Sequence, residues 1–445
     1  MVNRLGISCI IALCLGFTPA YAGDVTGVDG LSVSISNSPA ISIADGGNVD
    51  GFSRLRVSSP FGVIDSKQLY NQNSSRTTEI TNGVGAAITY LPNEAATSLS
   101  VGTVSGEYVI RQSGRYLSYV SGKSQLIFAT GVLGAGVANV VKRVGYFDDN
   151  NGLFFQLSGT TLSVVRRSPT SGAVVDTVVN QADWNLDKLD GTGKSRINID
   201  TSKTQIFIID FQWLGVGRVR YGFDIDGQMV YVHELLNANN LMTVYMSSPS
   251  LPVRYEIRNV GASAGGTLKE ICYSVASEGG FAPPGAEFAV ARDANPVSVS
   301  TYRPVFAIRL KSSYNSKANR KSVRLLHADF FHTGNVDVLY SIVHINDPSG
   351  LTATWTSVNA DSGVEYSADI SAVTGAHVHT IINTYSSSGS ASSGAPVVSS
   401  IESVNEHSYI SQNYNSDNSQ MFVIYAKALS GTASVYGGFE WIEFD

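Results

Sequence analysis

Two histidines separated by one residue are the first side chains in this sequence that could do chemistry. His377 and His379 lie on the same face if their segment is a β-strand, because side chains alternate between the two faces of a strand. Zinc takes three or four protein ligands, and this pair supplies two. The candidates for a further ligand are His327, His332 and His344. One sequence does not show that these residues meet, so we interpret the pair as surface or interface histidines and predict no bound metal.

An acidic turn offers the oxygen ligands that calcium prefers. Asp148 and Asp149 are followed by Asn150, Asn151 and Gly152. The segment does not continue into the spaced loop with a terminal Glu that a dedicated calcium-binding hand requires. Asp, Asn and Gly also gather in turns for reasons of backbone geometry alone. The sequence therefore favours a turn and no cofactor, with Ca²⁺ as the one candidate ion.

The acids on strand-like segments do not form the pair that a glycosidase needs. Asp210 and Glu256 lie in the apolar runs 208–211 and 255–257, and neither has a second acid two to four residues away on the same strand face. The sequence also contains no Cys/His nucleophile pairing beyond the lone Cys272 and no phosphate-binding glycine loop before a helix. We predict that the chain is not an enzyme and has no catalytic residues.

Aromatic side chains are the remaining candidates for ligand binding. Trp184, Trp213 and Tyr245 could stack on sugar rings if they lined an exposed groove. In a β-rich protein, however, a Trp or Tyr more often belongs to the core or to a subunit interface. We retain the three residues as candidates for a ligand of unknown identity.

The elements that must carry these residues are β-strands, and residues 204–234 give the clearest example. Val219, Tyr221 and Phe223 alternate with polar residues, a period of two that places one set in the core and the other in water. Asp226 and Gly227 then suit a tight hairpin turn. We predict that residues 206–231 form central antiparallel strands of a sandwich, with those three side chains buried. The nearby arginines predicted to bridge acids across strands or subunits are Arg218, Arg220 and Arg254.

Composition extends this all-β prediction to the whole chain. The 445 residues include 43 Gly, only 15% are charged, and Val, Ile, Thr and Ser are abundant. We predict two antiparallel β-sandwich or jelly-roll domains, at 68–280 and 286–445, preceded by an N-terminal arm at 23–67. The net charge of −6 argues against nucleic-acid binding, which needs a basic surface.

The first 22 residues resemble a secretory leader. Arg4 precedes an apolar run at residues 5–17, and Ala20-Tyr21-Ala22 has the small residues that signal peptidase tolerates. Cys9 and Cys14 lie in this leader, so cleavage after it would leave Cys272 alone and exclude an internal disulfide. We expect a signal-like leader at residues 1–22.

Three segments of the sequence, taken in order, are distinctive. They are Phe52-Ser53-Arg54-Leu55-Arg56-Val57-Ser58 with Asp65-Ser66-Lys67-Gln68, Phe211-Gln212-Trp213-Leu214-Gly215-Val216-Gly217-Arg218-Val219-Arg220, and Leu251-Pro252-Val253-Arg254-Tyr255-Glu256-Ile257. Together they resemble structural proteins of tailed bacteriophages of the tail, head-appendage or decoration type. The resemblance covers about residues 50–260 and continues faintly to the closing Phe439-Glu440-Trp441-Ile442-Glu443. It implies a β-sandwich virion component with no catalytic residues. A secretory leader departs from this pattern, because phage structural proteins assemble in the cytoplasm.

Two kinds of function fit these features. The first is a non-enzymatic virion protein, namely a capsid decoration, fibre or tail appendage that contacts other virion proteins and host-surface glycans. The second is a secreted lectin-like adhesin or carbohydrate-binding protein of a bacterium, which the leader favours. The resemblance favours the first. We also expect a homo-oligomer, because open strand edges need cover, and the resemblance implies a trimer.

Overall fold

The computed structural model of the chain describes residues 49–51, 55–56, 60–280, 285–387, 397–400, 408–413 and 419–444. The chain divides into two units, Met1–Ala44 and Asp45–Asp445. The predicted leader, most of the predicted arm and residues 281–284 between the two predicted domains lie outside the described residues. All described residues belong to the second unit.

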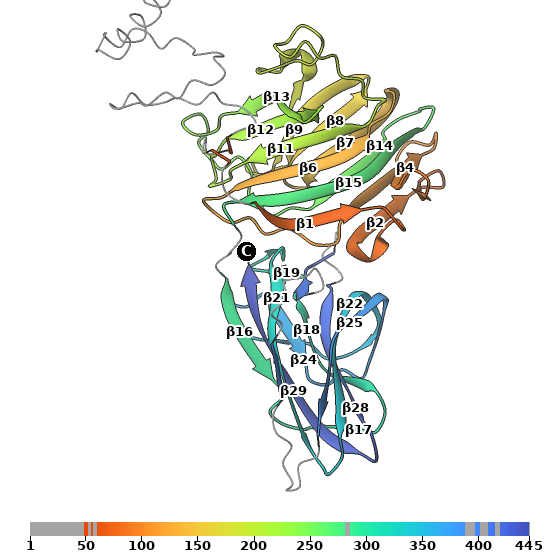
Figure 1. Cartoon of the computed structure of the whole chain (residues 1–445), viewed down its shortest axis with the longest axis vertical. Coiled ribbons are helices and arrows are strands. Elements are labelled where there is room, and N and C mark those ends of the chain that lie inside the picture. Colours follow the sequence, from red (N-terminus) through yellow and green to blue (C-terminus); the bar gives the residue numbers. More distant parts are fainter. Residues whose placement is uncertain are drawn as a thin grey trace, which may run out of the picture. The chain divides into compact units, whose positions relative to one another are not determined.

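The first half of this unit consists of two antiparallel sheets (Figure 1). The eight-stranded sheet has the order β13-β12-β11-β6-β15-β4-β3, with β1 also paired to β15. The seven-stranded sheet has the order β10-β9-β8-β7-β14-β5-β2. The strands of the eight-stranded sheet are β1 (Phe61–Lys67), β3 (Ala87–Leu91), β4 (Ala96–Val101), β6 (Ser124–Val132), β11 (Gln205–Phe211), β12 (Val219–Ile225), β13 (Gln228–Leu235) and β15 (Gly266–Glu278). Those of the seven-stranded sheet are β2 (Thr77–Asn82), β5 (Tyr108–Ser113), β7 (Val137–Phe147), β8 (Gly152–Gly159), β9 (Thr161–Ser168), β10 (Val175–Asn180) and β14 (Val253–Asn259).

The second half contains two further antiparallel sheets of six strands each, with the orders β16-β29-β21-β26 and β23-β24-β18-β28-β22-β25. In the former, β17 also pairs with β29 and β27 with β21, and β19 and β20 form a separate hairpin. The former sheet contains β16 (Ala286–Ala291), β17 (Val297–Val299), β21 (Ser322–Thr333), β26 (Val397–Ser400), β27 (Tyr409–Ile410) and β29 (Ala433–Phe444). The latter contains β18 (Arg303–Leu310), β22 (Val338–Thr352), β23 (Thr356–Ser357), β24 (Val364–Ser367), β25 (Ala372–Ser386) and β28 (Met421–Ala428). The hairpin strands are β19 (Ser313–Tyr314) and β20 (Lys317–Ala318).

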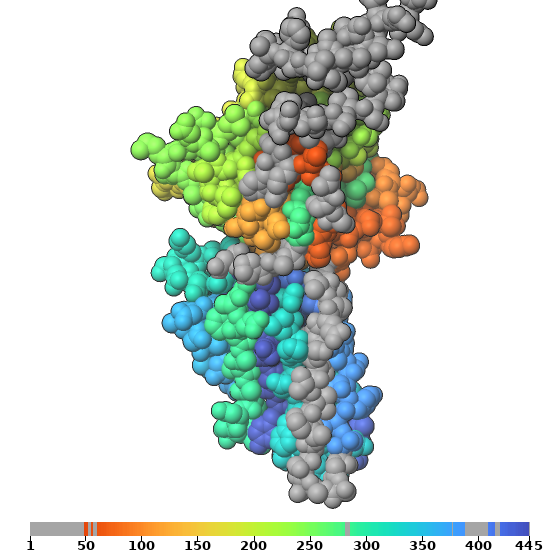
Figure 2. Space-filling view, turned by 60° about the vertical axis from the view of Figure 1, so that its left-hand side comes forward, coloured from red at the N-terminus to blue at the C-terminus, as the bar shows by residue number. Residues whose placement is uncertain are grey.

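Each pair of sheets encloses its own apolar core, so both halves are β-sandwiches. In the first, the Phe155 ring on β8 lies 4.9 Å from the Phe223 ring on β12, so a contact joins the two sheets. In the second, the Phe306 ring on β18 lies 6.0 Å from the Phe439 ring on β29. The colours in Figure 2 show that each sandwich is built from its own stretch of sequence. The predicted all-β class with two antiparallel sandwiches is confirmed.

Regular helix contributes little to the described part of the chain. Two single turns of 3-10 helix, η1 (Ser74–Arg76) and η2 (Gln181–Asp183), are present, and neither has a buried residue. Within these ranges, no helix has the length and apolar character needed to cross a bilayer. Any binding surface of the described residues is therefore formed by strands and loops.

The stretch at 204–234 folds as strands β11, β12 and β13. Val219, Tyr221 and Phe223 are fully buried, as predicted. Asp226 and Gly227 have φ of 54° and 79°, the positive values that a type I′ hairpin turn requires. One part of the prediction was wrong, because β13 lies at the end of the eight-stranded sheet and is not central.

The first strand of the first sandwich begins before residue 68, where the sequence predicted the boundary between the arm and this domain. β1, which falls in the range predicted as arm, pairs antiparallel with β15 from Phe61 opposite Ser277 to Lys67 opposite Cys272. The first sheet therefore begins seven residues earlier in the chain than predicted. Val63, Ile64 and Ser66 of β1 are buried, and the register with β15 shifts between Gly62 and Ile64, so the strand lacks a regular alternation.

Candidate functional site

The candidate histidines His377 and His379 do not come together with a third ligand in the described part of the chain. In the described part of the chain, no three His, Cys, Asp or Glu side chains form a group that could hold a metal ion. His377 and His379 lie on β25, and the register places His379 opposite His344 on β22. The two rings of that cross-strand pair are 6.4 Å apart, and burial lowers the pKa of His379. His377 lies opposite Asn346, whose side chain is an amide and not a metal-binding imidazole.

The acidic turn binds the protein's own backbone and an arginine. Asp148 is buried, and its Oδ1 accepts hydrogen bonds of 2.8 Å from the N–H groups of Asn150 and Asn151. The carboxylate of Asp149 pairs with the Nη1 atom of Arg254 at 2.8 Å. The oxygens proposed as calcium ligands thus already have partners, and the turn interpretation accounts for the contacts that they make.

The three aromatic candidates are placed unfavourably for stacking on a sugar. Trp184 and Tyr245 are almost fully buried in the core of the first sandwich, so neither ring offers a face to a ligand. Their polar atoms donate to backbone carbonyls, Trp184 Nε1 to Val179 O and Tyr245 OH to Gln212 O. Trp213 is half-buried and donates from Nε1 to Met246 O. Trp184 and Tyr245 are therefore core residues, whereas Trp213 packs against the core with a partly exposed ring and stays a candidate.

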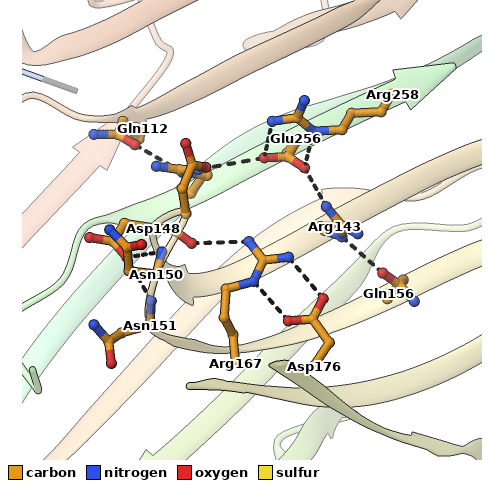
Figure 3. Close-up of polar contacts among 12 residues, drawn as sticks. Gln112, Arg143, Asp148, Asn150, Asn151, Gln156, Arg167, Asp176, Glu256 and Arg258 are labelled. Atoms are coloured by element: carbon orange, nitrogen blue, oxygen red, sulfur yellow. Dashed lines mark hydrogen bonds and ion pairs between the residues drawn. The ribbon is translucent and has the colours of Figure 1, made fainter. Parts of the chain in front are cut away.

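A row of charged side chains crosses the outer face of the seven-stranded sheet (Figure 3). Arg254, Glu256 and Arg258 alternate along β14, so all three project from one face of the strand. The register places Arg143 of β7 directly opposite Glu256. We call these four residues the arginine–glutamate row. Their arrangement follows from two ordinary rules of sheets, the period of two and cross-strand pairing.

Glu256 is held by all three arginines of the row. Its Oε1 accepts from Arg258 Nε at 2.6 Å and from Arg143 Nη1 at 2.7 Å, while Arg254 Nη1 lies 3.5 Å from Oε2. Burial alone would raise the pKa of this carboxyl, but the Arg143 and Arg258 guanidinium groups lower it to about 2. Glu256 is therefore ionised throughout the physiological pH range and has no proton to deliver to a leaving group.

The arginines of this face also stack on aromatic rings. The Arg254 guanidinium carbon lies 5.1 Å from the centre of the Phe147 ring, and that of Arg258 lies 4.6 Å from the Tyr108 ring. The guanidinium of Arg143 lies over Phe154, which Arg167 also covers. These cation–π contacts cover rings that would otherwise face solvent.

Polar partners at the margins fix the orientation of the same arginines. Arg143 Nε donates to Gln156 Oε1 at 2.8 Å, and Arg254 Nε donates to Gln112 Oε1 at 2.9 Å. Arg167 binds both oxygens of Asp176 at 2.8 and 2.9 Å (Figure 3). Bidentate pairs of this kind fix the guanidinium plane. The outer face of the sheet is thus an ordered polar layer.

A second cluster centres on Asp210, on the outer face of the eight-stranded sheet. Asp210 is fully buried and accepts from Arg220 Nη2 at 2.5 Å, Tyr231 OH at 2.8 Å and Ser124 Oγ at 3.0 Å. Arg56, from the predicted arm, also pairs with it. Arg220 was predicted to bridge an acid across strands, and this is confirmed, since Asp210 lies opposite it on β11. The prediction that this face lies in water was wrong, because arm residues cover it.

The arm is attached to this cluster through its backbone and Arg56. Val49 O accepts from Arg220 Nη2 at 2.7 Å, and the N–H of Gly51 donates to Ser124 Oγ at 3.0 Å. Arg56 Nε also lies 3.3 Å from Glu278 Oε1. Burial raises the pKa of Glu278, Arg56 opposes the shift and Asp210 adds to it, and the resulting pKa is about 7. Residues 49–51 and 55–56 therefore lie against the outer face of this sheet, and we call them the strap.

A third ion pair runs through the interior of the first sandwich. Arg111 on β5 donates from Nε to Glu270 Oε2 on β15 at 2.7 Å, and both side chains are fully buried. Glu79 of β2 also pairs with Arg111, and Gln68 donates to Glu270 Oε1 at 2.9 Å. Burial raises the pKa of Glu270 despite the opposing charge of Arg111. This pair links the two sheets at a point where core residues would otherwise meet.

Sequence reasoning found part of these clusters. It singled out Arg218, Arg220 and Arg254, and Arg218 does pair with Glu234 on the neighbouring strand at 3.6 Å. It missed Arg143 and the Arg111–Glu270 pair. The alternation Arg254-Glu256-Arg258 was a usable signal, because it predicts one charged face on β14. No local pattern could have identified Arg111 and Glu270 as partners, since 159 residues separate them.

Comparisons with known proteins find weak structural similarity only. No protein-family model matches the chain, and no curated protein matches it in sequence. A protein of unknown function from Shewanella oneidensis has 8% identity and a TM-score of 0.33, and the match covers 54% of this chain and 97% of that one. The CBM2 module of the evolved Dit of Lactobacillus casei phage J-1 has 9% identity and a TM-score of 0.30 over 50% and 98% of the two chains. A family 16 glycosyl hydrolase from Mycobacterium smegmatis has 9% identity and a TM-score of 0.31 over 48% and 99%.

Proposed function

We propose that this chain is a non-enzymatic structural protein of a phage particle whose first sandwich contacts glycans of the host surface. The absence of an enzymatic activity is proposed because the buried carboxylates on the strands of that sandwich form ion pairs. Asp210, Glu256, Glu270 and Glu278 are each paired with at least one arginine. A hydrolase would instead keep a carboxyl group accessible to its substrate.

The proton-transfer properties of these acids support the same conclusion. Glu256 has a pKa of about 2 and stays ionised. Glu278 has a pKa of about 7, which suits a general acid, but its side chain is buried and Arg56 of the strap is paired with it. A general acid must reach the leaving group of its substrate. Glu278 serves better as part of the attachment of the strap.

The particle assignment is supported by the sequence segments that resemble phage structural proteins. Arg56 belongs to the first of these segments and Arg220 to the second, and both pair with Asp210. Arg254 and Glu256 of the third segment belong to the arginine–glutamate row. The resembling residues therefore hold the sandwich and its strap together, which is a structural role.

Glycan contact is the function proposed for the polar layer on the seven-stranded sheet. Arg143 is partly exposed, and within the described residues its Nη2 atom makes no hydrogen bond. A guanidinium with a remaining donor, fixed in orientation by Gln156 and Glu256, can donate to the hydroxyl groups of a sugar. Val178 on β10, at the end of the same sheet, adds an exposed apolar surface.

Two measurements test the proposal. Mass spectrometry and immunogold labelling of purified phage particles should find the chain on the particle. Its presence only in bacterial culture supernatant would instead favour the secreted glycan-binding alternative.

Purified protein should bind host-surface polysaccharide, and Arg143→Met should weaken binding by about tenfold or more through loss of charged hydrogen bonds. Arg309→Met in the second sandwich is the matched control, since Arg309 also pairs with a glutamate. Equal binding by both variants would refute the role of the polar layer.

A further inference from the structure

A cavity of about 390 Å³ opens at three strands of the first sandwich. Residues 100–102, 135, 137, 142 and 264–267 line it. They belong to the ends of β4, β7 and β15 and to the loops that adjoin them. The volume is within the range of small-molecule sites. Apart from one lysine, the lining residues carry only Ser, Thr, Val, Ala and Gly side chains.

That lysine, Lys142, occupies a position on β7 where the pattern calls for an apolar residue. Val140 and Val144, two residues to either side, belong to the core, so Lys142 projects from the same face. Its strand neighbours in register are Leu157 and Ile257, which are also core residues. The Lys142 side chain is buried. A charged group in this position needs partners, because burying an unpaired charge is costly.

The partners of the Lys142 ammonium are two backbone carbonyls. Nζ donates to Leu133 O at 2.6 Å and to Ala135 O at 2.9 Å. An ammonium group has three N–H donors, so one remains. No carboxylate of the described residues forms an ion pair with it. Burial lowers the pKa of Lys142 to about 8.

The loops beside the ammonium group have glycine at two positions, so no side chain projects there. Gly134 has φ of 76°, and a Cβ atom there would lie 3.3 Å from Lys142 Nζ. Gly265 has φ of 77°, and a Cβ atom there would lie 2.8 Å from the carbonyl oxygen of Val101. Glycine is the residue that adopts these backbone angles without strain. The two loops can therefore approach the cavity as bare backbone.

We propose that this cavity binds the carboxylate of an acidic sugar, with Lys142 as the cationic partner. One ammonium supplies a single positive charge, which matches a carboxylate better than a phosphate dianion. The backbone of the lining glycines suits sugar hydroxyl groups, and Val101 and Val137 suit the apolar face of the ring. The choice of a sugar rests on the proposed glycan contact, whereas the choice of an acid rests on Lys142.

A purely structural role for Lys142 makes a different prediction. If the ammonium only ties Leu133 O to Ala135 O, Lys142→Met should change stability and leave every ligand unaffected. A bound carboxylate, by contrast, raises the pKa of the ammonium from about 8. Binding should then be strong below pH 8 and weaken as the pH rises through that value. At pH 9, each binding event should also take up a proton.

Isothermal titration calorimetry of the full chain provides the test, with methyl glucuronide as the acidic probe and methyl glucoside as its neutral counterpart. The glucuronide should bind at least tenfold more tightly than the glucoside. Lys142→Met should remove this preference, and Ala264→Trp should block binding of both sugars from an exposed lining position. Lys269→Met is the control, since Lys269 is a partly exposed lysine of the same sandwich that pairs with Glu94.

The outcomes separate this inference from the proposed function. Glucuronide binding that survives Lys142→Met or Ala264→Trp would overturn the inference, as would the absence of glucuronide binding by the unaltered chain. Host polysaccharide binding that persists in Lys142→Met and is lost in Arg143→Met would overturn the inference and leave the glycan contact on the polar layer intact. Proton uptake at pH 9, measured in two buffers of different ionisation enthalpy, should accompany binding only where Lys142 is present.

Discussion

At the scale of single residues, the buried acids of the first sandwich act as acceptors for arginines. Glu256 has three such partners, Asp210 has two, and Glu270 is paired with Arg111 in the interior. Breaking one partner of a buried ion pair costs more than the pair contributes, because the remaining charge stays buried without compensation. These carboxylates should therefore be sensitive to substitution even though none of them is assigned a catalytic role.

Replacement of Glu256 should destabilise the fold strongly. Glu256→Gln removes the charge that Arg143, Arg254 and Arg258 share, and we expect the free energy of unfolding to fall by about 3–5 kcal/mol. Urea denaturation followed by tryptophan fluorescence measures the change. Glu365→Gln is the control, because its pair with Arg309 is partly exposed and should contribute less than about 1 kcal/mol. Equal effects of the two substitutions would contradict this account.

Glu278 should give the protein an unusual dependence of stability on pH. Its pKa is raised to about 7 in the folded protein, so folding favours its protonated form. Stability from this group is complete below its unfolded pKa near 4.5 and is lost as the pH rises through 7. The loss between pH 4.5 and 8 is up to about 3 kcal/mol. Thermal unfolding of Glu278→Gln should show a flatter profile over this window, and an unchanged profile would exclude Glu278 as its cause.

At the scale of elements, the attachment of the strap depends on Asp210. Asp210→Asn should weaken the ion pairs that Asp210 forms with Arg56 and Arg220. Arg56 belongs to the strap, and Arg220 donates to the backbone oxygen of Val49 in the strap. Hydrogen exchange of the peptide at 49–56 should become at least tenfold faster, including the Gly51 amide that donates to Ser124. Asp176→Asn, which alters the pair with Arg167, should leave that peptide unchanged. Equal exchange in Asp210→Asn and unaltered protein would show that the strap is held by other contacts.

Strand periodicity made the fold predictable. The contacts of the candidate site could be predicted only in part, because many of them join residues that lie far apart in the sequence. The burial of Val219, Tyr221 and Phe223 and the hairpin at Asp226 follow from local pattern and turn chemistry. The same pattern placed Arg220 in water, because alternation specifies a face and does not specify what covers it. That cover comes from the strap, more than 150 residues away along the chain. The cavity at Lys142 likewise requires loops from three distant parts of the sequence.

At the scale of the whole molecule, the open ends of the sheets remain to be covered. β10 lies at one end of the seven-stranded sheet, and Val175 and Val178 on it are about half exposed. Exposed apolar strand edges favour association with another chain. We predict a homo-oligomer, with a trimer expected from the resemblance to phage surface proteins. Light scattering during size-exclusion chromatography should give three times the chain mass, and a stable monomer across micromolar dilution would contradict the prediction.

The absence of catalysis is the central claim, and it is tested most directly by measuring the release of reducing sugar ends from a panel of host-surface polysaccharides. If the chain is a non-enzymatic glycan-binding protein, the purified protein should bind at least one of these polysaccharides. It should release no reducing ends above the buffer control between pH 5 and 8. Release at enzyme-like rates would contradict the account, above all if Glu278→Gln abolished it, because that residue has a pKa near 7 and would then be a general acid.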